Sequence, residues 1–477
     1  MSRERTKDGI KPDSADRGAG SSPRASVRPL RVRPERCAVA LILVIIFSLT
    51  VYRALTTNIT DDEASTYIFY ALPYRMFSWT YLKHMYTTCI ANNHWLNTAL
   101  IHLADLASPA GYSEAAVRIP NLAAFAAYLA AAYLGWRRGR FPLPVLAFLV
   151  SNYYLNEFYG LGRGYGLAHT FLFLSLLCFM EYRACGGDRY LVLMLLFLSL
   201  SSMSNTVVLL AYPAVGAAAL SEMAARRELK AYFRHHVLST AVFAAFTALM
   251  AGYHLGVSSR DRALYTGTGD FFHSVVLSYV RMLVTSKAAQ AAALAALLLL
   301  TVLSAAAFLH NKKAGRNSVP VLFLALVIFA LTIILSGKLF SMGYITGRAA
   351  LPFWSLAVLG FGDLFSAGTR SAEEILRKRN KGTEEDREKA LSAVFSAGGL
   401  VLAAAAVLLF VRKIDLTSTE DWPWDYGTRE RVAAVYEKYG RYPEDEPVQD
   451  YADVFYINKY APLYGADEYP AKLYTDE

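Results

Sequence analysis

Long apolar runs alternate with short polar segments over most of the chain. A helix rises about 1.5 Å per residue, so about 20 apolar residues cross the hydrocarbon core of a bilayer. We identify eleven such runs, several of them shorter than this length: 37–57, 116–136, 142–158, 165–181, 190–204, 206–221, 237–256, 288–309, 319–337, 349–366 and 391–411. The pattern predicts an all-α polytopic membrane protein with about 11 transmembrane helices.

The polar segments divide the chain into three parts. Residues 1–36 are rich in Arg, Pro, Ser and Asp, which predicts a disordered basic cytoplasmic arm. Residues 37–411 form the expected transmembrane bundle, and residues 58–117 form a long loop that should lie outside the membrane. The first apolar run is too far from Met1 for the core of a signal peptide, so we expect an uncleaved span.

The long loop and the C-terminal segment contain shorter helical patterns. Two amphipathic stretches, Tyr67–Tyr81 and Leu96–Leu106, are typical of helices that lie in the membrane interface. In residues 412–477, Thr428 is expected to cap a helix that ends at Gly440. This tail carries 15 acidic and 8 basic residues together with 13 Trp, Tyr or Phe, and we expect it to pack on the outer face of the bundle.

The distribution of positive charge gives the orientation. With the N-terminus in the cytoplasm, the inner segments hold 29 of the 48 Lys and Arg residues and the outer loops hold nine. Such a bias follows the positive-inside rule, and an odd number of spans then places the C-terminal tail outside.

Composition excludes several classes of protein. The chain is 55% hydrophobic and only 18% charged, whereas soluble domains carry about 25% charged residues. We therefore expect no nucleic-acid partner despite the net charge of +9. Of the four cysteines, only Cys89 should lie well outside the membrane on the outer side, so no disulfide framework is expected.

Asp62 and Glu63 are the first candidate catalytic residues, and they allow two compatible readings. Thr60 and Glu63 have the spacing of a capping box, and acids in a first turn are favoured by the helix dipole. A carboxylate at a helix N-terminus also has its pKa held down, so it stays ionised and can accept a proton from a hydroxyl.

Further candidates lie in the same outer loop and in a second segment expected on the outer side. Asn93 and His94 stand at a predicted helix start, where they either cap the helix or share a site with the acids. Glu157 and Arg163 are ionisable residues at a span end, which are costly unless paired, solvated or used. The glycines around Tyr165 indicate close helix packing rather than a nucleotide fingerprint.

Lys338, Tyr344 and Arg348 make up the last candidate group. The cations either reach to lipid headgroups or clamp a phosphate at the membrane surface. The spacing of Asp62 and Glu157 allows a divalent cation between them but does not require one.

The order of these features resembles the GT-C superfamily of membrane glycosyltransferases. Its elements are one span, the outer Asp62-Glu63 pair, amphipathic helices, Asn93-His94, an Arg-x-Pro sequence and Glu157-Phe with Arg163-Gly-Tyr165-Gly. The branch most similar contains the protein O-mannosyltransferases and the lipid A aminoarabinose transferase, over roughly residues 37–365. His94 is followed by Trp95, where many relatives have proline.

The resemblance implies a glycosyltransferase that uses a polyprenyl-phosphate-linked sugar on the extracytoplasmic face, with inversion expected at the anomeric carbon. It implies that Asp62 is the base with Glu63 beside it, and that Glu157, His94 and Asn93 serve the acceptor or act as a second acid. Arg163, Arg348, Lys338, Tyr165 and Tyr344 would lie near the donor phosphate. The acceptor would be a glycan, a lipid or a protein, membrane lipids would surround the chain, and no cofactor would be required.

A non-catalytic transporter or lipid-binding protein is the alternative. Transporters place ionisable residues near the midplane of the membrane, whereas the candidates here cluster at one face. Heavy use of Ala and Leu favours a bacterial inner membrane, and in a eukaryote the endoplasmic reticulum would keep the same geometry.

Overall fold

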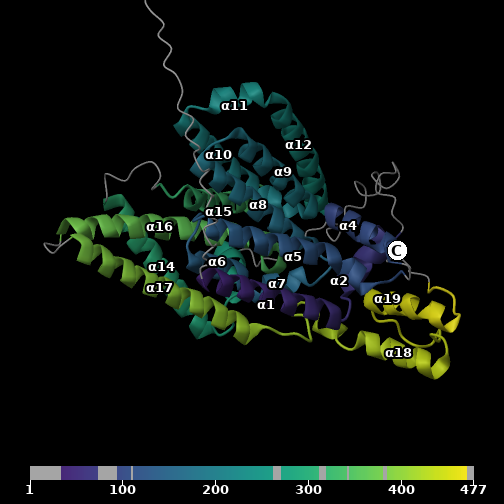
Figure 1. Ribbon diagram of the computed structural model, residues 1–477. Coiled ribbons are helices and arrows are strands. Elements are labelled where there is room, and N and C mark those ends of the chain that lie inside the picture. The colour runs from purple at the N-terminus through teal and green to yellow at the C-terminus, as the bar shows by residue number, and fades with distance from the viewer. Residues whose placement is uncertain are drawn as a thin grey trace, which may run out of the picture.

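The computed structural model describes residues 34–72, 94–108, 111–260, 270–310, 319–340, 343–379 and 384–469 (Figure 1). In this part of the chain every regular element is helical. The predicted arm up to residue 33, Cys89 and Asn93 lie outside the described residues.

Within the described residues, eight helical segments are long and apolar enough to cross a membrane, which confirms an α-helical polytopic membrane protein. They are α1 (Pro34–Thr56), α5 (Glu114–Arg137), α8 (Gly164–Cys185), η2 with α10 (Thr206–Arg226), α12 (Val237–Arg260), α14 (Lys287–His310), α15 (Val321–Phe340) and η6 with α16 (Gly347–Arg379). In the most apolar stretch of α8, 72% of the residues are buried, whereas none are buried in the corresponding stretch of α14. Thus α8 is central, whereas α14 presents apolar side chains outward, as a lipid-facing helix does.

Polar residues interrupt the chain at two places between these helices. Asn205 is extended and its side chain accepts a hydrogen bond from the Val207 N–H, which separates α9 (Asp188–Ser204) from η2 (Thr206–Ala211). The expectation of one continuous helix over 142–158 is wrong. The chain instead forms α6 (Leu143–Val150) and α7 (Tyr153–Tyr159), because the Asn152 side chain caps α7.

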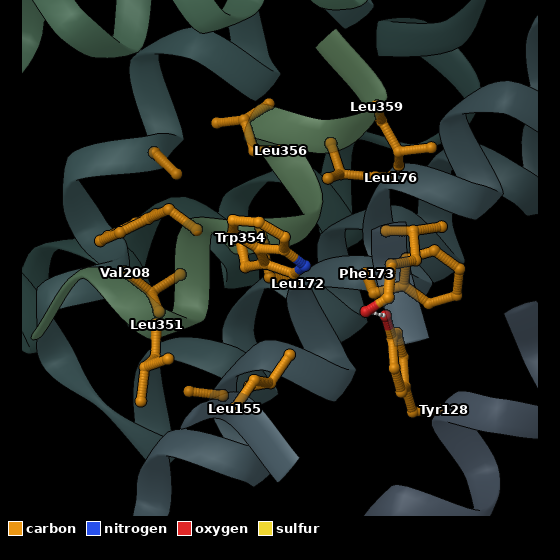
Figure 2. Packing of buried hydrophobic residues seen from close by; sticks show 14 of the residues in the cluster. Tyr128, Leu155, Leu172, Phe173, Leu176, Val208, Leu351, Trp354, Leu356 and Leu359 are labelled. Carbon is orange, nitrogen blue, oxygen red and sulfur yellow. Dashed lines mark hydrogen bonds between the residues drawn. The ribbon is translucent and has the colours of Figure 1, made fainter. Parts of the chain in front are cut away.

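The break after α6 leaves carbonyl groups that other helices satisfy. The Tyr128 hydroxyl donates to the Leu149 carbonyl at 2.8 Å, and the Trp354 indole donates to the Phe148 carbonyl at 3.0 Å. Figure 2 shows Tyr128 and Trp354 among the packed side chains of α8 and α16. An unpaired carbonyl in an apolar interior costs several kcal/mol, so these bonds make the break tolerable.

A second, smaller core joins the tail to the loop after α1. The tail helix α19 (Tyr451–Tyr460) packs against α2 (Asp61–Thr66) and against the other tail helix, α18 (Thr428–Tyr439), at the end of the molecule where Figure 1 is yellow. The loop contributes η1 (Tyr67–Ala71) and α4 (Trp95–Leu106). Their shared core consists of Ile59, Ala64, Tyr67, Ile68, Ala71, Ile101, Tyr112, Val117, Val432, Tyr436, Ala452, Val454, Phe455, Tyr456, Ile457 and Ala461.

The helix expected at Thr428 begins and ends close to its predicted limits. Gly440 ends α18 with a φ of +66°, a left-handed conformation that favours glycine. Thr428 is the first helical residue, however, and Gly427 occupies the cap position. The amphipathic helix expected over Leu96–Leu106 is confirmed as α4, which starts one residue earlier.

Truncation of Phe455 should loosen the tail. Its buried ring lies 5.4 Å from the ring centroids of both Tyr67 and Tyr112, so Phe455→Ala removes contacts to the loop as well as to the tail. We expect a loss of about 3–5 kcal/mol in the stability of the docked tail. Limited proteolysis and thermal unfolding in detergent would measure it. Leu463→Ala, at a side chain that is 75% exposed, is the control, and an equal loss there would contradict the assignment.

Candidate functional site

Two successive acids at the start of α2 have different environments. The capping box is confirmed: the Glu63 N–H donates to Thr60 Oγ1 at 3.3 Å, and Glu63 Oε2 accepts from the Thr60 N–H at 3.0 Å. Successive side chains on a helix point about 100° apart, since a turn takes 3.6 residues. Asp62 and Glu63 therefore face different neighbours.

Glu63 is fully buried and both of its oxygens have strong partners. Arg118 donates from Nε to Oε1 at 2.9 Å and from Nη2 to Oε2 at 2.8 Å, and the Gly162 N–H donates to Oε1 at 2.5 Å. The remaining N–H groups of Arg118 donate to the carbonyls of Ala54, Thr57 and Asn58, and so satisfy free carbonyls at the C-terminal end of α1. This arrangement places Glu63 in a structural role and leaves no lone pair directed at a substrate.

Asp62 lies between two arginines. Its Oδ2 is 3.2 Å from Arg163 Nη2 and 2.9 Å from Arg348 Nη1, and the side chain stays 17% exposed. Arg163 is itself fixed to α2, because its Nη1 donates to the Asp62 carbonyl at 3.0 Å and to Thr66 Oγ1 at 3.1 Å. Three segments that are distant in sequence thus bring together one carboxylate and two guanidinium groups.

The glycines beside Arg163 allow this approach. A Cβ at Gly162 would lie 2.3 Å from the Val117 side chain, and one at Gly164 would lie 2.2 Å from the Ser204 carbonyl. Only glycine avoids these overlaps, so the motif serves close packing of the backbone. As a result, Arg163 at the N-terminus of α8 reaches α2.

His94 and Tyr165 complete one side of the cluster. His94 is only 5% exposed, its ring lies 5.1 Å from that of Tyr165, and its Nε2 has no hydrogen-bond partner. Burial, with added repulsion from Arg163 and Arg348, lowers the pKa of His94 well below its ordinary value. The imidazole is therefore neutral. It precedes α4, but its side chain makes no capping bond.

The remaining candidates lie away from the carboxylate of Asp62. Glu157 pairs with Arg53 at 2.9 Å and accepts from the Glu420 N–H at 2.9 Å. Lys338 is exposed in the last turn of α15, and Tyr344 lies against Gly337 and Phe271. Among the described residues, no group of three or more His, Cys, Asp or Glu side chains is placed to hold a metal ion.

The tail brings two residues that sequence reasoning missed. Both oxygens of Asp421 accept from the Tyr154 hydroxyl, at 2.8 and 2.9 Å. The ring of Trp422 lies under the Arg348 guanidinium, 5.0 Å from its carbon to the ring centroid. The available signal was an aromatic pair, Trp422 and Trp424, directly after two acids in an otherwise polar tail. It could not reveal which partner the pair meets.

A second group of acids joins the tail to α2. Asp425 Oδ2 accepts from the Asp61 N–H at 2.9 Å, and Asp61 Oδ1 accepts from the Tyr451 N–H at 2.9 Å. Burial and the charges of Asp450 and Asp61 raise the pKa of Asp425. These carboxyl groups therefore hold a proton more tightly when the tail is docked.

No family model, curated protein or solved structure matches the chain.

Neutralising Glu63 should cost stability. In Glu63→Gln the shape is kept, but the Arg118 guanidinium stays buried without its counter-charge, which costs about 3–5 kcal/mol for such pairs. Thermal unfolding of the purified protein would measure the loss. Asp62→Asn is the matched control because Asp62 is partly exposed, and an equal effect at both positions would contradict the structural role of Glu63.

Tail docking should weaken as pH rises. The docked state raises the pKa of Asp425 above the ordinary value of about 4 for an aspartate. The docked tail is therefore most stable at a pH below about 4, and its stability falls as the pH increases above that value. Asp425→Asn cannot ionise, so its unfolding temperature should depend less on pH. Thermal unfolding of both proteins from pH 4.5 to 8 would test this, and parallel curves would contradict it.

Proposed function

We propose that this protein is a glycosyltransferase that moves a sugar from a polyprenyl-phosphate donor to an acceptor hydroxyl on the extracytoplasmic face. The single observation that carries the proposal is the Asp62 carboxylate between Arg163 and Arg348. It combines a proton acceptor with two cations suited to a phosphate, at one end of an apolar bundle.

The topology we propose has eleven crossings, with the N-terminus inside and the C-terminus outside. The end of α17 (Glu384–Lys413) leads into a segment where Arg53 donates to the Ser418 carbonyl at 2.6 Å. Arg53 lies near the end of α1, so the tail and the loop after α1 share one face of the bundle. An odd number of crossings is required for this. Three further crossings, formed by the pair α6–α7, by α9 and by α17, bring the eight apolar segments to eleven crossings.

The reaction assigns different roles to the grouped residues. Asp62 takes the proton of the acceptor hydroxyl as that oxygen attacks the anomeric carbon. The bond from that carbon to the phosphate oxygen breaks, and Arg163 and Arg348 stabilise the departing lipid phosphate. A phosphate leaving group needs no proton from the protein, so one carboxylate suffices, unlike glycoside hydrolysis. A single displacement inverts the anomeric centre.

Neighbouring residues support this chemistry in the proposal. Neutral His94, with its free Nε2, and Tyr165 line the side of the site near Arg163, where an acceptor or a sugar hydroxyl can bond. Glu63 and Arg118 hold α2 in place. Glu157, Lys338 and Tyr344 have partners or positions elsewhere, and we assign them no step. The proposed mechanism uses no cofactor.

The lipid nature of the donor and the position of the site point to an integral membrane enzyme. The donor's isoprenoid chain would stay in the bilayer while its phosphate reaches the arginines at the headgroup level. The bacterial inner membrane is our preferred location, and the acceptor is a glycan, a lipid or a protein.

One observation favours a transporter as a second candidate. The break between α6 and α7 lies within a membrane-length segment, and broken helices form transport sites. At this break, however, Tyr128 and Trp354 bond the free carbonyls, so those groups are not available to a substrate or ion.

Asp62→Asn should abolish detectable transfer while the protein stays folded. Loss of a general base typically lowers a reaction rate by about 10²–10⁴-fold. Glycan and glycolipid mass spectrometry would compare cells lacking the protein with cells rescued by wild type, by Asp62→Asn and by Asp467→Asn. The last is a matched control at an exposed tail residue.

Loss of one monosaccharide from a surface molecule, restored by wild type and Asp467→Asn but not by Asp62→Asn, would support the proposal and identify the acceptor. Rescue by Asp62→Asn would contradict the assignment of Asp62 as the catalytic base. An unchanged glycome in cells that express the protein normally would favour the transporter.

A further inference from the structure

Three consecutive tail residues reach into the bundle beside the candidate site. The Glu420 N–H donates to Glu157, Asp421 accepts from Tyr154, and Trp422 packs against Phe158 with ring centroids 6.0 Å apart. Each of these three partners belongs to α7. The segment that follows α17 is thus held along one helix, directly beside Arg348.

Trp422 supports the guanidinium of Arg348 from one face. The side chain of Trp422 is only 4% exposed, whereas that of Arg348 is 38% exposed. Arg348 therefore extends from a buried aromatic surface toward open space, with Asp62 as its ion-pair partner. An indole ring attracts a cation and fixes the plane of a guanidinium, which favours binding of a phosphate by two parallel hydrogen bonds.

Asp421 puts a second negative charge near the same arginine. Tyr154 fixes both carboxylate oxygens, and the charges of Arg348, Arg163 and Asp62 all act on this group. The site then contains two arginines and two aspartates and is neutral without substrate. An incoming phosphate must compete with Asp62 for Arg348 and is also repelled by the charge of Asp421.

We propose that residues 420–422 form part of the donor-phosphate site, with Trp422 positioning Arg348 and Asp421 acting as a built-in counter-anion that weakens phosphate binding. This inference rests on the proposed function and adds the tail to its donor site. It gives neighbouring residues opposite effects: Trp422 strengthens the binding of a lipid phosphate, whereas Asp421 opposes it.

Binding of a polyprenyl phosphate to the full-length protein in detergent, at pH 8, tests the inference. Trp422→Leu removes the ring and should raise the Kd about tenfold, within the range that a partly desolvated cation–ring contact supports. Trp422→Phe keeps an aromatic packing surface with a weaker attraction and should raise the Kd less. Asp421→Asn keeps an acceptor for Tyr154 but removes the charge, so its Kd should fall about two- to fivefold, as expected for a partly screened charge.

Trp424→Leu is the matched control, because Trp424 stands two residues away and is 63% exposed. Its Kd should equal that of wild type. The corresponding polyprenyl alcohol, which lacks the phosphate, is the second control: its affinity should be the same in all variants, whereas general damage to the fold would change it.

The possible outcomes separate the two proposals. Wild-type protein that binds the phosphate no better than the alcohol would overturn the donor class, and this inference with it. Wild-type binding that prefers the phosphate, with Kd values unchanged in Trp422→Leu and Asp421→Asn, would overturn the role of the tail alone. A decrease in affinity at both positions would also overturn it, because the proposal requires opposite signs.

Discussion

The buried pair of Glu63 and Arg118 is the interaction on which the rest of this structure depends. One guanidinium bonds both oxygens of Glu63 and three carbonyls at the end of α1, while Glu63 also accepts from the Gly162 N–H. Four segments, α1, α2, α5 and the turn before α8, are thereby joined at one point. Desolvation of two charges is costly, and only this complete set of hydrogen bonds compensates for it.

That joint determines where the candidate site lies. With α2 fixed from behind by Glu63, Asp62 is directed to the opposite side, toward Arg163 and Arg348. Gly162 lets Arg163 come close, since any side chain there would overlap Val117. The site is thus supported by groups that have no chemical role in the proposed reaction.

The tail makes the site a property of the whole chain. Its helices share a core with the loop after α1, and its Asp421 and Trp422 lie beside Arg348. Acids of the tail and of α2 meet at Asp61, Asp425 and Asp450, so we expect the stability of this junction to depend on pH.

Local patterns predicted much of this arrangement. The capping box, α4, the end of α18 at Gly440 and the break at Asn205 follow from residues within a few positions of each other. The resemblance placed Asp62, Arg163 and Arg348 in one site, and the structure brings them together. The break at Asn152 was not predicted, since an apolar run gives no sign that a distant Tyr128 and Trp354 will bond its carbonyls.

The sequence by itself determined the class of protein, the apolar segments, and the set of residues capable of acid–base and phosphate chemistry, because hydropathy and side-chain chemistry are local properties. Only the tertiary structure decided that Glu63 is enclosed while Asp62 is partly open, that Glu157 pairs with Arg53, and that Trp422 packs against Arg348. These outcomes depend on which distant segments pack together, and neighbouring residues of the same type can then have entirely different surroundings.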